Sequence, residues 1–123
     1  MDTKFVCCIP ILTVKDPLQA KEFYVNKLGF KLSFEWGDPI SYLGLEQDDV
    51  SIHLIGSTIS RQEAGTGNIS IITNEVDKYF SQCKSNGVEI IIEPADREYG
   101  LRDFGLKDMD GNILNFGCDV HGH

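Results

Sequence analysis

The sequence is short of positive charge. It has 11 lysine and arginine residues against 19 aspartate and glutamate residues, a net charge of -8 over 123 residues. Because nucleic acids are first recognised through their phosphates, this balance argues against a nucleic-acid partner. The acidic excess favours a cationic ligand, although an acidic solvated surface is the commoner explanation.

Long apolar runs and cofactor motifs are also lacking. No apolar stretch approaches the length that spans a bilayer, and no basic segment followed by an apolar one opens the sequence. We therefore expect a cytoplasmic protein without a membrane partner. A glycine-rich phosphate loop, a Ser/His/Asp order and a Cys/His couple are absent, so the sequence predicts no cofactor and no catalytic residue.

Cysteines are few, and none forms a CxxC pair. Free thiols buried in a reducing compartment are the predicted state of Cys7, Cys8, Cys83 and Cys118. Cys7 and Cys8 are adjacent in an expected strand, so their side chains should point to opposite faces of it.

Hydrophobic patterning predicts a single domain, residues 1–123, made of two similar modules. The order strand, helix and three strands occurs at about 5–55 and again at about 68–118, and a polar linker at about 56–67 joins the two. The expected strands are 5–14, 30–36, 40–46, 50–55, 68–73, 88–93 and the two arms of a closing hairpin. A helix begins at Asp16-Pro17 and ends at Gly29, and a second spans 74–86. The fold class is therefore α+β, with two βαβββ modules.

Two stretches carry a family likeness. Gly100-x-Arg102-x-Phe104-x-Leu106-x-Asp108-x-Asp110-Gly111-Asn112, followed by Phe116, resembles the last hairpin of the vicinal oxygen chelate superfamily. Within this glyoxalase/bleomycin-resistance/dioxygenase family it is closest in look to bleomycin-resistance proteins. Ile9 to Asp16, with Phe23-Tyr24 and Leu28-Gly29-Phe30, looks like the family's opening strand and helix, whereas Met109 stands where the family usually has proline. The resemblance implies mixed sheets curled around a cleft with helices outside, and a homodimer whose clefts form at the subunit interface.

The resemblance also identifies four strand positions that hold a divalent metal in metal-using members: Ile9, His53, Asn68 and Asn115. Such a cation prefers carboxylates and imidazoles. An isoleucine donates nothing, and an amide donates weakly and without charge. The other two histidines, His121 and His123, lie close to the end of the sequence. The sequence therefore predicts no metal site.

Strand alternation sorts the remaining candidates. Val50, Ile52 and Leu54 form the apolar set of one strand, so His53 faces the cleft; Leu114 and Phe116 likewise leave Asn115 facing it. The predicted ligand-binding residues are His53, Asn68, Asn115, Trp36, Tyr42, Tyr99 and Arg102.

Each candidate also has a purely structural interpretation. His53 is either a base or ligand contact, or a hydrogen-bonded wall residue. The two asparagines form a polar floor or merely strand-end polarity. Aromatic residues of strand 30–36 either stack on a flat ligand or pack in the core; Phe30 and Leu32 are assigned to the core and Trp36 stays open. Arg102 either meets an anionic group or, by preference, pairs with an acidic side chain.

The predicted function is metal-independent binding and sequestration of a small molecule, such as an antibiotic or a cationic aromatic compound. One rival is a metal-dependent lyase, isomerase or dioxygenase with an altered ligand set. The other is a non-catalytic interaction subunit that uses the dimer surface. Fold alone does not choose among these functions.

Overall fold

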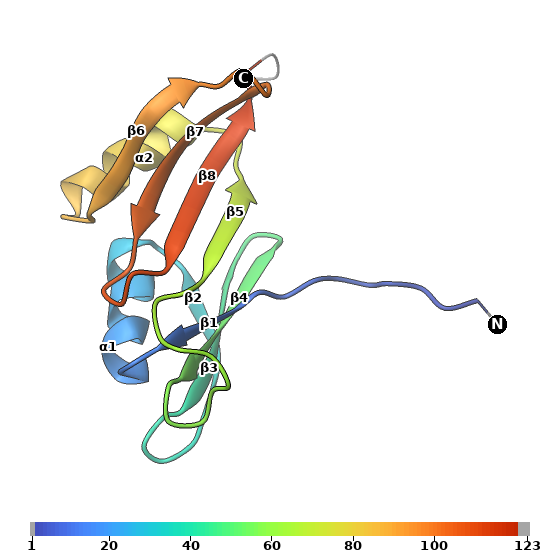
Figure 1. The fold of residues 1–123 in the computed structure, drawn as a ribbon, viewed down its shortest axis with the longest axis vertical. Helices are drawn as coiled ribbons and strands as arrows, with labels where there is room; N and C mark the ends of the chain where they lie inside the picture. Colours follow the sequence, from blue (N-terminus) through green and yellow to red (C-terminus); the bar gives the residue numbers. More distant parts are fainter. Residues whose placement is uncertain (1, 121–123) are drawn as a thin grey trace.

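The computed structural model describes residues 2–120 and places two modules end to end along its long axis (Figure 1). Each module is a four-stranded mixed sheet with a helix against one face. This confirms the α+β class and its two βαβββ modules. Neither sheet closes into a barrel.

The first module forms sheet A, with strand order β1-β4-β3-β2 and β1 parallel to β4. Its elements are β1 (Ile11–Val14), α1 (Pro17–Glu22) with a π-helical continuation (Phe23–Lys27), β2 (Lys31–Trp36), β3 (Tyr42–Gln47) and β4 (Val50–Gly56). Asp16 caps α1 as predicted, because its carboxylate accepts from the N–H groups of Leu18 and Gln19. Gly29 follows the helix with φ of 86°, a conformation that glycine adopts readily.

The second module repeats the arrangement as sheet B, with strand order β5-β8-β7-β6 and β5 parallel to β8. Its elements are β5 (Asn68–Ile72), α2 (Val76–Ser85), β6 (Ile90–Asp96), β7 (Leu101–Lys107) and β8 (Ile113–Asp119). Residues 57–67, between the modules, contain no strand or helix.

The hydrophobic core lies between each sheet and its helix. Strand residues that alternate toward the helices are buried, including Ile52, Leu54, Leu114 and Phe116, as the sequence pattern predicts. Both helices lie on the same side of the molecule (Figure 1). We call the other side of each sheet its open face, since no helix packs there.

Buried polar contacts join the two modules. Asp108, in the β7–β8 turn and 4 % exposed, accepts five hydrogen bonds, from Tyr24 Oη (2.7 Å), Asn112 Nδ2 and the N–H groups of residues 110, 111 and 112. Asn112 Nδ2 also donates to the carbonyl of Thr13 in β1. Burial, and then the charge and hydrogen bond of Asp108, raise the pKa of Tyr24 well above its usual value. The family-like hairpin turn therefore helps to fasten the second module to the first, together with the hydrogen bond from Tyr79 Oη to the Leu28 carbonyl.

The first expected strand is shorter than predicted. β1 begins at Ile11, and residues 2–10 form an extended arm that leaves the molecule on the side away from the helices (Figure 1). Proline has no N–H to donate to a ladder, and Pro10 stands where the arm leaves the sheet. Cys7 and Cys8 are consequently exposed, which contradicts their predicted burial, whereas Cys83 and Cys118 are buried free thiols.

The assignment of Leu32 to the core is also wrong. A bulge between Leu32 and Phe34 shifts the β2–β3 register, and β2 is an edge strand. Leu32 is 37 % exposed as a result, while Phe30 is buried as predicted.

Candidate functional site

The open face of sheet A carries a cluster of aromatic side chains. Strand pairing aligns residues of the four strands in two neighbouring rows. On each strand the residues of the two rows are two positions apart, so their side chains point to the same face. The first row is Ile11, His53, Gly44 and Phe34, and the second is Thr13, Ile55, Tyr42 and Trp36. The predicted residues Trp36, Tyr42 and His53 therefore stand side by side.

Contacts within this cluster fix the rings. Tyr42 Oη and His53 Nδ1 are 2.8 Å apart and share a hydrogen bond. The Phe34 ring stacks on Tyr42 at 6.0 Å between centroids and meets the His53 ring edge-on at 5.1 Å. Gly44 makes room for Phe34, because a Cβ at position 44 would collide with that ring. Burial raises the pKa of Tyr42 above its usual value.

Part of the aromatic cluster remains accessible. Phe34 is 41 % exposed and Trp36 is 65 % exposed. Rings that neighbours hold in place, with one side uncovered, offer a surface on which a flat molecule can stack. We call Phe34, Trp36, Tyr42 and His53 the aromatic surface.

The predicted asparagines meet on the open face of sheet B. Asn115 Nδ2 donates to Asn68 Oδ1 at 2.8 Å and to the carbonyl of Ile69 at 3.0 Å. The two amides form a polar pair, on a different sheet from His53.

Tyr99 precedes β7 and contacts a cluster formed by Arg97 and Asp103. Its hydroxyl donates to Asp103 Oδ2 at 2.6 Å, and Arg97 Nε donates to Asp103 Oδ1 at 2.7 Å. The hydrogen bond to Asp103 raises the pKa of Tyr99. Partial burial raises the pKa of Asp103, but the hydrogen bonds from Tyr99 and Arg97 outweigh it, so that this pKa lies below its usual value.

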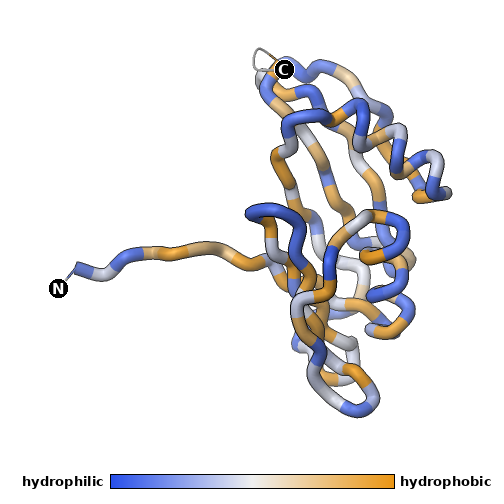
Figure 2. Tube along the Cα trace, turned by 180° about the vertical axis from the view of Figure 1, so that it is seen from behind, coloured by the Kyte–Doolittle hydropathy of each residue, from blue (hydrophilic) through white to orange (hydrophobic). Residues whose placement is uncertain are grey.

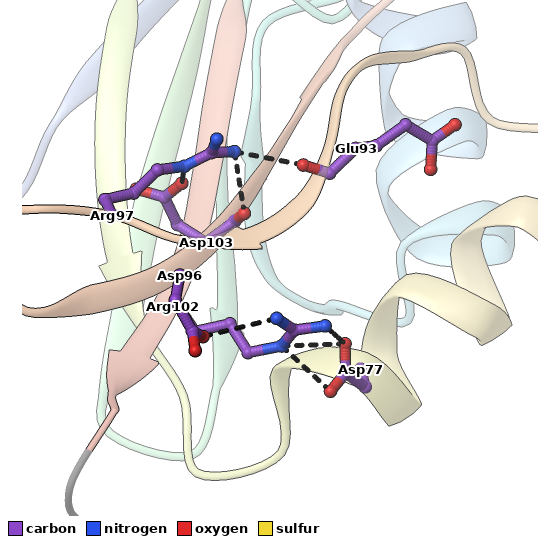
Figure 3. Close-up of polar contacts among 6 residues, drawn as sticks. All are labelled: Asp77, Glu93, Asp96, Arg97, Arg102 and Asp103. Carbon is purple, nitrogen blue, oxygen red and sulfur yellow. Dashed lines mark hydrogen bonds and ion pairs between the residues drawn. The ribbon is translucent and has the colours of Figure 1, made fainter.

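Arg102 lies on the opposite, helix-covered face of sheet B. It pairs with Cys118, which is buried, and its guanidinium binds Asp77 of α2 and Asp96 of β6 (Figure 3). The hydrogen bond to Asp77, and then that to Asp96, raise the pKa of Arg102. The preferred interpretation of Arg102 as an ion-pair residue is thus confirmed, and the structure places it away from the other candidates.

The residues at the family's metal positions do not fit a divalent cation. Among residues 2–120, no three His, Cys, Asp or Glu side chains lie close enough together to hold one. His53 supplies a single imidazole, and Asn68 and Asn115 supply only neutral amides that bond to each other. Ile9 lies in the arm, outside β1. His121 and His123 lie outside the described residues.

Sequence reasoning missed two parts of the surface. Ile11 and Ile55 flank His53 on the open face and follow from the same alternation that placed His53 there. A hollow of about 480 Å³ also lies at the junction of the modules, where the β3–β4 turn, the end of β5 and α2 meet. None of the predicted site residues lines that hollow, and no local sequence pattern signals it.

In the described part of the chain, no helix combines the length and apolar character needed to cross a membrane.

Comparison with known proteins identifies one protein family and a relative in the same size range. The model of the Glyoxalase/Bleomycin resistance protein/Dioxygenase superfamily matches residues 6–116. The protein YetH of Bacillus subtilis (strain 168) is 26% identical over 106 residues, which cover 82% of this chain and 88% of YetH.

Two solved structures illustrate the shared fold. TioX from Micromonospora sp. ML1 has a TM-score of 0.79 at 18% identity, covering 91% of this chain and 97% of TioX. The bleomycin-binding protein of Streptomyces verticillus, complexed with copper(II)-bleomycin, has a TM-score of 0.77 at 22% identity, covering 94% and 97% of the two chains. The chain therefore belongs to the glyoxalase/bleomycin resistance protein/dioxygenase superfamily.

Proposed function

We propose that this protein binds a flat, positively charged aromatic molecule on the aromatic surface of sheet A, without a metal ion, and so sequesters it. The single observation that carries the proposal is the uncovered cluster in which Phe34, Tyr42 and His53 hold one another in place. Trp36 extends the cluster at the strand end.

Charge and chemistry support this ligand class. The net charge of -8 attracts cations over distances set by the ionic strength. Stacking on a ring contributes about 0.5–1.5 kcal/mol beyond the burial of area. A cation held over an aromatic face gains about 0.5–2 kcal/mol more. The His53–Tyr42 pair adds polar groups that can orient the ligand.

A homodimer is part of the proposal. Among residues 2–120, no helix or further strand covers the open face of either sheet, and ligand sites enclose most of a small molecule's surface. A second copy that covers the open face of sheet A supplies the missing wall. The asparagine pair on sheet B is then available as a polar wall of the same cleft.

The fold shared with a bleomycin-binding protein supplies a first probe. Isothermal titration calorimetry should detect binding of bleomycin, or of the flat acridine cation proflavine, to chelator-treated protein. Binding should be unchanged by added zinc, nickel or manganese, and weaker at high salt.

Two results would count against the proposal. If neither probe binds at millimolar concentration, the small-molecule function is wrong. If binding needs one metal ion per chain, the rival of a metal-dependent enzyme with an altered ligand set gains.

A further inference from the structure

The hollow at the junction of the two modules has the size and position of a small-molecule site. Its volume of about 480 Å³ lies in the range of about 300–1,000 Å³ that such sites have, and they form preferentially between domains. Both modules line it, the first with residues 28–30 and 47–50 and the second with residues 71–74, Tyr79, Gln82 and Phe116. Neither module forms the hollow alone.

The hollow is separate from the aromatic surface. Val50 of β4 and Phe116 of β8, which line it, alternate with the same sets as the buried residues Ile52 and Leu114. The hollow therefore lies on the helix side of the sheets, whereas the aromatic surface lies on the open face of sheet A. A ligand in the hollow does not compete with one on the aromatic surface.

The floor of the hollow is apolar and its walls are joined. Phe30 and Phe116 are each 4 % exposed. Tyr79 Oη donates to the Leu28 carbonyl at 2.6 Å, and the Tyr79 ring lies 4.7 Å from that of Phe116 between centroids. Because this hydrogen bond runs from α2 to the first module, it holds the two walls of the hollow together. The hydrocarbon part of a ligand thus finds a preformed surface.

The border of the hollow is negatively charged. Asp48 and Asp49, in the β3–β4 turn, are exposed and line it. Figure 2 shows this turn as a hydrophilic loop at the level where the two modules meet. Among residues 2–120, no ion pair joins either carboxylate to a basic side chain, and no lysine, arginine or histidine lines the hollow. The hollow therefore disfavours anions and attracts cations.

The composition of the lining also selects the kind of cation. Calcium and similar ions require six or more oxygen ligands, and within the described range 2–120 no third His, Cys, Asp or Glu stands close enough to complete such a site. An apolar floor contributes nothing to a bare metal ion. An organic cation uses both parts, since its carbon chain covers the floor while its charge stays near the carboxylates.

We propose that the hollow binds a small organic ammonium ion, a primary amine with an apolar chain. The charged nitrogen lies near Asp48 and Asp49, and the chain lies on Phe30, Val50 and Phe116. This second site is independent of the ligand proposed for sheet A. Because the hollow is lined by both modules, an occupant stabilises their junction by its binding free energy.

A titration followed by nuclear magnetic resonance tests the site with hexylammonium as the probe. In ¹⁵N–¹H spectra the amides of Val50, Ile71 and Gln82 should shift saturably. Hexanol and hexanoate share the chain but lack the positive charge, and should bind at least tenfold more weakly. High salt should weaken the binding of hexylammonium.

Substitutions separate local charge from net charge. Asp48→Asn with Asp49→Asn should weaken hexylammonium binding about three- to tenfold, the effect of two exposed charges. The control pair, Glu63→Gln with Glu98→Gln, changes the net charge equally, from -8 to -6, at exposed residues outside the hollow and should leave the affinity within twofold. Gln82→Trp, an exposed position of α2 that lines the hollow, should fill it and abolish binding.

Three results would overturn the proposal. Hexanol that binds as tightly as hexylammonium would show an apolar hollow without selection for charge. Equal weakening by the two charge pairs would show a general attraction of cations to the surface. Shifts that are absent at millimolar hexylammonium, or that fall on the open face of sheet A, would exclude the hollow as the site. Proflavine binding that persists in the same samples would leave the function proposed for sheet A standing.

Discussion

The open faces of the two modules share one framework and differ in chemistry. On sheet A a row across the strands reads Ile11, His53, Gly44 and Phe34, and on sheet B the matching row reads Ser70, Asn115, Gly105 and Ile92. Each row has a polar residue on its second strand, a glycine on the third and a large apolar residue on the fourth. The repeated fold therefore determines which positions face the open side of each sheet. The residue types at these positions differ, so the open face of sheet A carries aromatic rings and that of sheet B carries amides.

The two hairpin turns show the same division. The β3–β4 turn, with Asp48 and Asp49, is exposed, whereas the β7–β8 turn is buried around Asp108. The β7–β8 turn forms hydrogen bonds to the other module, through Tyr24 and the Thr13 carbonyl. Equivalent turns of the two modules thus differ, because one is exposed to solvent and the other is buried around a hydrogen-bonded carboxylate.

The largest expected effect comes from removing the buried carboxylate. Asp108→Ala leaves Tyr24 Oη, Asn112 Nδ2 and three N–H groups without their acceptor, so the free energy of unfolding should fall by about 3 kcal/mol or more. Asp49→Ala, in the exposed turn, should change it by less than about 0.5 kcal/mol. Urea denaturation followed by circular dichroism measures both. Equal stabilities of the two variants would contradict the contrast between the turns.

An intermediate effect should distinguish the two glycines. Gly44→Ala drives its Cβ into the Phe34 ring and should cost about 1–3 kcal/mol, while Gly105→Ala meets Asn115 Oδ1 at 3.3 Å and should cost less. In a Phe34→Ala background the cost of Gly44→Ala should shrink, because the ring is gone. Thermal unfolding of the four sheet A proteins gives the coupling energy. A coupling of zero would show that Phe34 does not sit over Gly44.

The smallest effect concerns the pH dependence of stability, which acts at low pH through sheet B and at high pH through sheet A. The lowered pKa of Asp103 contributes stability that is present above the unfolded value of about 3.9 and lost as pH falls through the folded value. Asp103→Asn should reduce stability by about 0.2–1 kcal/mol at pH 6 and by less below about pH 4. The raised pKa of Tyr42 on sheet A affects stability at high pH. Because the folded state holds this proton more tightly, stability falls as pH rises above about 10. Urea midpoints across this range should show both trends in wild type; an Asp103→Asn deficit that persists below pH 4 would contradict the assignment.

Much of the fold could be predicted from the sequence because its signals are local. Alternation in β4 and β8, the Asp16 cap and the glycines that follow the helices depend on neighbouring residues only. The departure of the arm at Pro10 and the exposure of Leu32 could not be predicted in this way, since they depend on which strand edge is occupied and on a bulge.

Part of the candidate site could also be predicted from the sequence, again where the signal is local. Alternation placed His53 on the open face, and pairing then brought Tyr42 and Trp36 beside it. Alternation puts Arg102 on the same face as Phe104 and Leu106, but its ion-pair partner Asp77 lies 25 residues earlier, and no short-range pattern reports such a contact. Features that depend on neighbouring residues could thus be predicted, whereas contacts between residues far apart in the sequence could not.

The most direct test of the aromatic surface is a titration of Trp36 fluorescence with proflavine, because Trp36 is the only tryptophan. We expect saturable quenching in wild type, with N-acetyltryptophanamide correcting for absorbed light. Phe34→Ala and His53→Ala should weaken binding about two- to tenfold with little change in melting temperature. Leu18→Ala, an exposed apolar residue on the helix side, should leave the affinity unchanged. Linear quenching without saturation, or equal affinity in all four proteins, would contradict a ligand site on sheet A.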